Sequence, residues 1–187
     1  MISISNSPSF IAILWRYIAE ALRFSYTSIM RIIGIDPGTG ILGFGVIDAH
    51  GGATRLVTAG VITTPAHTPI PERLGEIFDG LTSIIAETQP TMMAIEKLFF
   101  TRNITTAMSV AEARGVALLT GQRAGLRIEE YTPLQIKQTI TGYGKADKKQ
   151  VQEMVRLQLG LQTVPKPDDC ADALAAAIMA AFMTRQS

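Results

Sequence analysis

Four carboxylates in this 187-residue chain stand where acids could do chemistry. Asp36 ends an apolar run over residues 31–36, and Glu96 ends another over residues 91–96. An acid at the end of a buried strand is costly unless its desolvation is offset. Divalent cations with oxygen ligands provide such an offset, and they also promote phosphodiester hydrolysis.

Two further acids, Asp169 and Asp172, begin an alanine-rich run that is predicted to be helical over residues 169–183. Their i, i+3 spacing places both on one helix face. Acids in a first turn also favour the helix dipole by ~0.3–1 kcal/mol, so alone the pair is more simply explained as capping. Asp168 is the expected N-cap. Together with the two strand-end acids, the pair would form a group that repels itself unless cations bind.

Two cations held by these acids would serve a hydrolytic reaction directly. One would lower the pKa of a bound water, and the other would stabilise the leaving 3′ oxygen. Asp36 is best placed to bridge both ions. A basic residue near the site would stabilise charge on the phosphate, with Lys148 as the first candidate and Lys137 as the second.

Hydrophobic periodicity and turn residues predict the elements that position these acids. Strands are predicted at 31–36, 42–48, 54–63, 91–96 and 126–131. Helices are predicted at 72–87, 103–123, 133–140, 147–159 and 169–183. Three meandering strands followed by alternating helices and strands indicate an α/β fold with a mixed sheet. Ligands in such sheets bind beyond strand carboxyl ends, where Asp36 and Glu96 are predicted to lie.

Several motifs resemble one family in the order in which they occur. Residues 33–40 (IGIDPGTG) and 43–47 (GFGVI) resemble the opening of RuvC-type crossover junction endodeoxyribonucleases, the Holliday-junction resolvases of bacteria. Residues 94–99 (AIEKLF) resemble its second acidic strand, and residues 113–117 (ARGVA) resemble its central helix. Residues 136–139 (IKQT) and 148–152 (KKQVQ) resemble its basic segment, and residues 169–175 (DCADALA) resemble its final acidic helix. The resemblance covers about residues 30–183, and the ordered set is highly specific.

That resemblance implies an RNase H-like fold, which here would be a mixed five-stranded sheet flanked by helices. It also implies catalytic, metal-binding roles for Asp36, Glu96, Asp169 and Asp172, with magnesium as the cofactor, and the chemistry above predicts two ions per site. The implied substrate is four-way junction DNA, cut by paired symmetric nicks in DNA recombination and repair. The implied assembly is a homodimer in the bacterial cytoplasm, with a branch-migration helicase complex as partner.

The candidate DNA contacts are one aromatic and five basic side chains. Phe99 matches an aromatic residue of the family that stacks with DNA near the crossover. Lys137 and Lys148 match basic residues of the family that meet DNA near the cleavage site. The basic candidates are Arg102, Lys137, Lys145, Lys148 and Lys149. Without the acids, the basic segment would be explained as a solvated helix face.

Composition bounds the class of protein. A chain with 47% hydrophobic residues fills one core, and a single cysteine, Cys170, excludes an intramolecular disulfide framework and fits a reducing cytoplasm. The net charge of +1, from 17 basic and 16 acidic residues, is low for a protein that contacts many phosphates. Two divalent cations would neutralise the four acids, and the basic residues cluster between Lys137 and Arg156, so both facts lessen this discrepancy.

The first 29 residues are predicted to be an extension ahead of a nuclease domain at 30–187. The uncharged stretch from Met1 to Trp15 is too short to span a bilayer and lacks a basic region before its apolar part, so no membrane association is expected. An amphipathic helix lying on a membrane or partner is one alternative. We favour Met30 as the real start, because the family normally starts near it.

Three other functions compete with junction cleavage. ATPases of the actin and sugar-kinase type use a similar Gly-Ile-Asp-Pro-Gly-Thr hairpin for phosphates, but they need two such lobes and this chain is too short. A non-catalytic binding module would be expected to lack one of the four acids. A general RNase H activity is the closest rival, because it would use the same metal ions.

Overall fold

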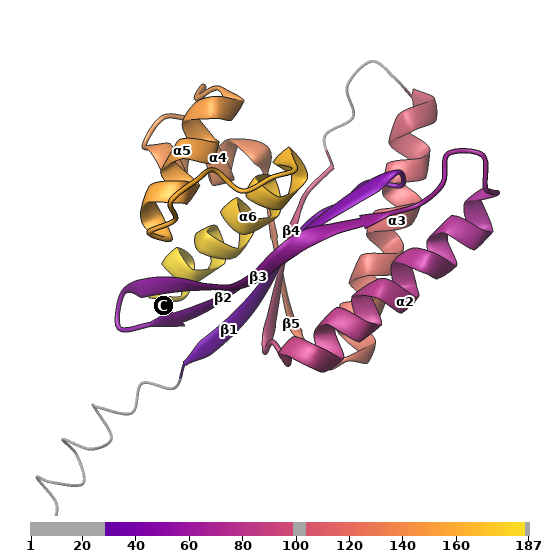
Figure 1. Cartoon of the computed structure of the whole chain (residues 1–187), viewed down its shortest axis with the longest axis horizontal. Helices are drawn as coiled ribbons and strands as arrows, with labels where there is room; N and C mark the ends of the chain where they lie inside the picture. Colours follow the sequence, from indigo (N-terminus) through magenta and orange to yellow (C-terminus); the bar gives the residue numbers. More distant parts are fainter. Residues whose placement is uncertain (1–28, 99–103, 186–187) are drawn as a thin grey trace, which may run out of the picture.

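The computed structural model describes residues 29–98 and 104–185, which form one mixed sheet between two layers of helices (Figure 1). The strands are β1 (Met30–Asp36), β2 (Ile41–His50), β3 (Ala53–Thr63), β4 (Met92–Glu96) and β5 (Arg127–Tyr131). Their order is β3-β2-β1-β4-β5, with antiparallel pairing among β1, β2 and β3 and parallel pairing of β4 with β1 and β5. The predicted mixed five-stranded α/β fold is confirmed.

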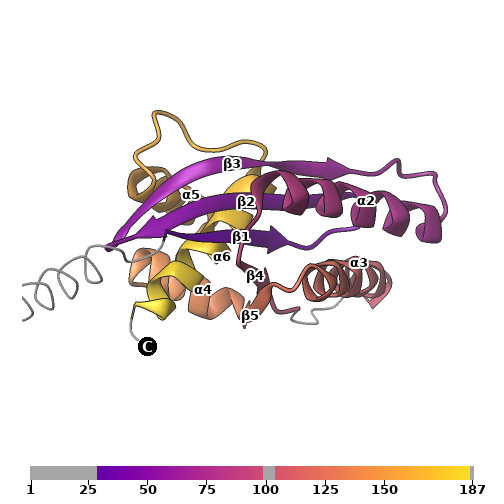
Figure 2. The ribbon, with the colours of Figure 1, turned by 90° about the horizontal axis from the view of Figure 1, so that it is seen from below.

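The helices are α2 (Ile70–Thr88), α3 (Ile104–Arg123), α4 (Pro133–Thr141), α5 (Lys148–Gln158) and α6 (Asp168–Thr184). Figure 2 shows α2 and α3 on one side of the sheet and α4, α5 and α6 on the other. Each predicted helix is present within a few residues of its expected bounds. None of the helices in the described part of the chain is long and apolar enough to cross a membrane.

Alternation along the central strands decides which side each residue faces. Ile33 and Ile35 of β1 belong to the core under α2 and α3, whereas Ile32 belongs to the core under α6. The same alternation places Asp36, the last residue of β1, on the α6 side. In β4, Met92 and Ala94 pack on the α6 side, so Glu96 at the strand end follows them there.

Glycines in β1 and β2 let α6 approach the sheet closely. A β-carbon on Gly34 would overlap the carbonyl oxygen of Ala173, and one on Gly43 would overlap the carbonyl oxygen of Asp169. Gly34 pairs with Gly45, whose own β-carbon would collide with Leu174. The backbone of α6 therefore lies directly on β1 and β2, which fixes how far its first turn stands from Asp36.

A buried hydrogen-bond chain supports the turn that follows β1. The hydroxyl of Thr64 donates to the carbonyl of Thr39 at 2.6 Å, and Nε of Arg73 donates to the Thr64 hydroxyl at 2.8 Å. The Thr64 amide also donates to the carbonyl of Gly40 at 3.0 Å. The turn after Asp36 is thus tied to the end of β3 and to α2.

The expectation that Asp168 caps α6 is wrong. The N-cap is Pro167, which has no side-chain cap, and its carbonyl accepts a 3.0 Å hydrogen bond from the Cys170 amide. Asp168 lies inside the first turn, where its carboxylate reaches Lys148 at 3.5 Å. Asp168 therefore forms an ion pair with Lys148 of α5 instead of capping α6. The Cys170 side chain is buried, as expected of a small packed residue.

Candidate active site

Asp36 and Glu96 lie at one edge of the sheet because the strands that carry them are parallel neighbours. β1 and β4 pair in register up to Ile35 and Ile95, so the next residue of each strand is an acid at the same level. Both acids follow fully buried positions. Two carboxylates are therefore held side by side at the carboxyl ends of the central strands.

The first turn of α6 adds the other two acids. Asp169 lies over Gly43, the β2 residue that pairs with Asp36. Asp172 follows one turn later, and its side chain is 27% exposed. The close packing of α6 on glycines thus brings a helix end over the ends of two strands.

The charges of the four acids act on one another. Burial raises the pKa of Asp36 to about 7, with repulsion from Asp172, Glu96 and Asp169 adding to it. Burial also raises the pKa of Glu96, again with Asp172 contributing. The pKa of Asp172 is raised by burial, although Lys148 opposes this. In the absence of a cation, the protein therefore holds negative charge here at a cost.

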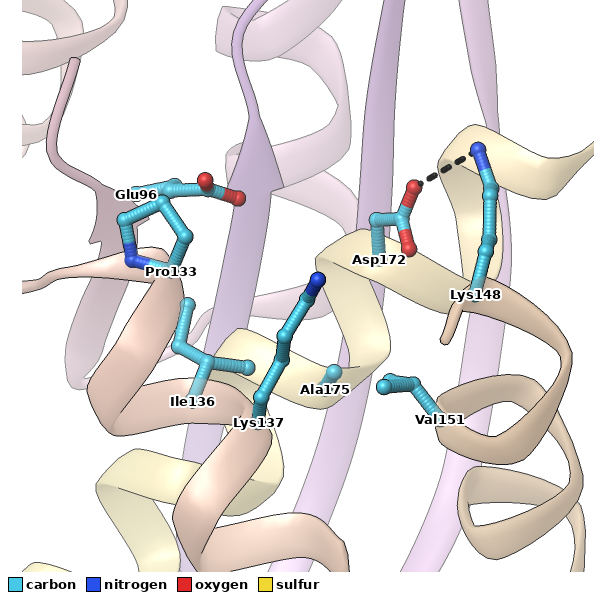
Figure 3. A pocket seen from close by; sticks show the side chains of 8 residues that line it. All are labelled: Glu96, Pro133, Ile136, Lys137, Lys148, Val151, Asp172 and Ala175. Atoms are coloured by element: carbon cyan, nitrogen blue, oxygen red, sulfur yellow. Dashed lines mark ion pairs between the residues drawn. The ribbon is translucent and has the colours of Figure 1, made fainter. Parts of the chain in front are cut away.

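Two lysines lie beside these acids around a cavity of about 250 Å³ (Figure 3). The ammonium of Lys148 is 3.1 Å from a carboxylate oxygen of Asp172, and Lys137 lies close enough to Glu96 to oppose the rise in its pKa. Burial acts to lower the pKa of Lys148, but its bonds to Asp172 and Asp168 outweigh this and raise it. The cavity is lined by Glu96, Pro133, Ile136, Lys137, Lys148, Val151, Asp172 and Ala175.

The four carboxylates suit a hard divalent cation, but their side chains are not arranged around a common metal position. Within residues 29–98 and 104–185, no group of three or more His, Cys, Asp or Glu side chains is arranged to hold a metal ion. One reason is visible in Figure 3, where Asp172 is turned toward Lys148. The four acids offer only oxygen donors, which magnesium prefers. The raised pKa values of Asp36, Glu96 and Asp172 show charge that a cation would compensate.

The remaining predicted site residues divide into two groups. Phe99 and Arg102 lie outside the described residues. Lys145 and Lys149 are exposed, the first in the loop before α5 and the second in the first turn of α5, and neither lines the cavity.

Sequence reasoning missed two contributors to the site. Asp168 shares Lys148 with Asp172, which a capping role did not suggest. Arg114 of α3 donates a 3.1 Å hydrogen bond to the backbone carbonyl of Glu96. The available signal for Arg114 was a charged residue inside a run of small residues, which predicted only close helix packing.

Comparison with known proteins places this geometry in a family. The family model described as crossover junction endodeoxyribonuclease RuvC matches residues 32–180. The chain belongs to the RuvC family. The resemblance found in the sequence motifs is thereby confirmed, and RuvC proteins are endonucleases that act on DNA.

Individual RuvC relatives match over nearly their whole length. The protein of Chloroflexus aggregans is 56% identical over 153 residues, which cover 82% of this chain and 93% of that one. The protein of Rubrobacter xylanophilus is 54% identical over 156 residues, covering 83% and 87% respectively. Both carry the name crossover junction endodeoxyribonuclease RuvC.

Solved structures agree with this assignment. Thermus thermophilus RuvC in complex with Holliday junction substrate matches with a TM-score of 0.80 and 38% identity, covering 84% of this chain and 96% of that one. The yeast mitochondrial Holliday junction resolvase matches with a TM-score of 0.63 at 14% identity, a likeness of fold alone.

Proposed function

We propose that this protein is a magnesium-dependent endonuclease that resolves four-way DNA junctions by paired symmetric nicks in bacterial recombination and repair. Membership of the RuvC family and the likeness to the junction-bound Thermus thermophilus structure support this function. A cytoplasmic location and a branch-migration helicase complex as partner belong to the same proposal, and both rest on the family resemblance. The domain that does this work is residues 30–187.

The observation that carries the proposal is that four carboxylates lie near one another, at the ends of β1 and β4 and at the start of α6, with the other three all raising the pKa of Asp36. A pKa near 7 for Asp36 means that its negative charge is poorly compensated by the protein alone. Two magnesium ions, when bound, would supply an activated water and charge stabilisation for the leaving 3′ oxygen. All three of the other acids raise the pKa of Asp36, so Asp36 would be the ligand shared by both ions, with Glu96, Asp169 and Asp172 as the remaining ligands.

Lys148 is placed to exchange its ion pair with Asp172 for one with a DNA phosphate. Its ammonium is held by Asp172 and Asp168, and half of its side chain is exposed to the solvent that DNA would displace. A phosphate in the site would offer it an oxygen, and Asp172 would then be free to act as a ligand. Lys137, on the other side of the cavity near Glu96, would hold the same strand.

The start of α5 adds further positive charge beside Lys148 and Lys137. Lys148 and Lys149 occupy the first turn, where cations oppose the helix dipole, and that turn contains no acid of its own. A phosphate backbone would be favoured by both the lysines and the helix N-terminus. Lys145 lies just before the Asp147 cap, so it would add to the positive charge that DNA meets at this end of α5.

A homodimer would give two cutting sites for the two strands of a junction, matching the substrate's two-fold symmetry. The exposed face of α3 supports this helix as the contact surface, because Met108 is 61% exposed, Leu119 is 55% exposed and Gly115 opens to free space. Ala113 and Ala117 of the same helix are buried against the sheet and lie outside this surface. Sedimentation with junction DNA tests the proposal, and one 20.2 kDa chain cutting both strands without dissociating would contradict it.

Junction cleavage separates the proposed function from its closest rival. We expect nicking of a synthetic four-way junction in magnesium, no nicking in EDTA, and no cutting of an RNA–DNA hybrid of the same sequence. A general RNase H would cut the hybrid under the same conditions. Cutting of the hybrid but not the junction would replace the proposed function with that rival.

A further inference from the structure

Arg114, near the middle of α3, reaches the strand end that carries Glu96. Its Nε–H donates a 3.1 Å hydrogen bond to the Glu96 carbonyl, and its Nη2 pairs with the carboxylate of Glu130 on β5. The Arg114 side chain is 17% exposed, whereas that of Glu130 is 41% exposed. One guanidinium thus joins α3, β4 and β5 at the point where β4 ends.

The Glu96 carbonyl needs such a donor because the sheet no longer supplies one on that side. Pairing between β4 and β1 ends at Ile95, and the next amide, that of Lys97, turns to the β5 side, where it donates a 2.8 Å bond to the Tyr131 carbonyl. A carbonyl that is shielded from water and has no partner is costly, and the bond from Arg114 to Glu96 is partly buried. Arg114 therefore replaces the missing ladder bond at the residue that bears the acid.

The direction of the Glu96 carboxylate depends on this backbone. In the described part of the chain, the carboxylate has no hydrogen bond or ion pair of its own, unlike Asp172, which Lys148 holds. Lys137 acts on it only through its charge. Whatever fixes the Glu96 main chain therefore also fixes the point from which its side chain enters the site.

An arginine suits this position better than any other cation. Its planar fork reaches two acceptors in different directions, whereas a lysine ammonium meets them as a single point. Burial lowers the pKa of Arg114, which shows the cost of placing a cation here. Glu130 offsets that cost, and it does so from the strand that also pairs with Glu96.

We propose that Arg114, braced by Glu130, is a positioning residue that holds Glu96 in the orientation required for magnesium binding and cleavage. The proposal rests on the proposed function of the site. Arg114 acts through the Glu96 main chain and contacts neither DNA nor metal. Loss of a residue that orients a metal ligand typically lowers metal affinity or activity by about 10–100-fold.

The test compares Arg114→Met and Arg114→Lys with the wild-type protein by two readouts. The first is the single-turnover rate on a four-way junction as a function of magnesium concentration. The second, independent of cleavage, is the rise in melting temperature that magnesium produces without DNA. We expect Arg114→Met to lower the rate by about 10–100-fold and to reduce the magnesium-induced rise by at least half, while Arg114→Lys recovers part of both. Junction affinity in EDTA should stay within about twofold of the wild type, because no phosphate contact is lost.

Two controls separate positioning from loss of stability. Arg127→Met removes an arginine of β5 that pairs with Glu129 at 2.7 Å and is more exposed than Arg114, so it should change neither readout. Asp48→Asn breaks the pair with Arg31 at the opposite end of β1, so it should lower the melting temperature but leave the magnesium dependence intact.

The outcomes distinguish this proposal from the proposed function. A wild-type protein that does not cut the junction in magnesium overturns the function, whatever the variants do. A cutting wild-type protein together with an unaffected Arg114→Met overturns only the positioning role. An Asp48→Asn variant that reproduces the loss of magnesium response also overturns it. If Arg114→Met does not fold, a wild-type magnesium response in Arg114→Lys overturns the positioning role.

Discussion

Replacing Asp36 with Asn should abolish cleavage and yet stabilise the metal-free protein at neutral pH. The carboxyl has a pKa of about 7 in the folded protein against an ordinary 3.8. A carboxyl with a raised pKa favours the folded state only while it is protonated, so the free energy of unfolding falls as pH rises from about 4 to about 7. Asn keeps the shape without the charge and should escape this loss.

The size of the effect follows from the same pKa. At about 1.4 kcal/mol for each unit of pKa, ionising Asp36 costs the folded state up to about 4 kcal/mol at pH 8. Relaxation and water entry reduce such values, so we expect Asp36→Asn to be about 2–4 kcal/mol more stable than wild type at pH 8 in EDTA. The difference should vanish near pH 4, where the wild-type carboxyl is protonated. Magnesium should narrow the gap by stabilising the wild type alone.

Urea unfolding at pH 4 to 8 in EDTA measures this difference directly. Asp48→Asn is a matched control with the opposite sign, because Arg31 holds the pKa of Asp48 below its ordinary value. Asp48 stabilises the fold above its unfolded pKa and loses that effect as pH falls through its folded pKa. Its Asn variant should therefore be destabilised at neutral pH, by about 1–3 kcal/mol for a broken charged hydrogen bond. The reasoning would be refuted if Asp36→Asn were no more stable than wild type at pH 8, or if its gain in free energy of unfolding did not change with pH.

Three further predictions test other parts of the structure. Lys148→Ala should slow cleavage and lower the slope of log affinity against log salt by about 0.9, measured by junction binding from low to high salt; an unchanged rate and slope would make this segment a solvated face. Gly43→Ala should shift the first turn of α6, because the new β-carbon meets the Asp169 backbone, costing about 1–3 kcal/mol of stability in urea and most of the cleavage rate; wild-type stability would show that α6 does not pack as described. Deleting residues 1–29 should leave the fold and the activity intact, as judged by circular dichroism and junction nicking, and loss of soluble expression would mean that the extension packs on the domain.

Most of the fold was predictable because its signals are local. The apolar runs ending at Asp36 and Glu96 predicted both strands and the sheet edge where they meet. The helical spacing of apolar residues predicted α2, and the alanine-rich run predicted α6. The bounds differ from those expected by only a few residues.

The parts that escaped prediction depend on contacts between distant segments. Asp168 has the composition and place of an N-cap, and only the approach of α5 shows that it pairs with Lys148. Arg114 is 18 residues from Glu96, and no spacing rule relates an arginine on a helix to a carbonyl at a strand end. The face of α3 was also ambiguous, because small residues such as Ala113 suit the sheet and a second helix equally well.

The central claim is that Asp36, Glu96, Asp169 and Asp172 together hold the metal ions for cleavage. Anomalous diffraction from crystals grown with Mn²⁺ in place of magnesium would test it most directly. We expect two peaks at the carboxyl ends of β1 and β4, with Asp36 contacting both and Lys148 no longer bound to Asp172. Peaks elsewhere, or a site without Mn²⁺ at concentrations that support junction cleavage, would contradict the account.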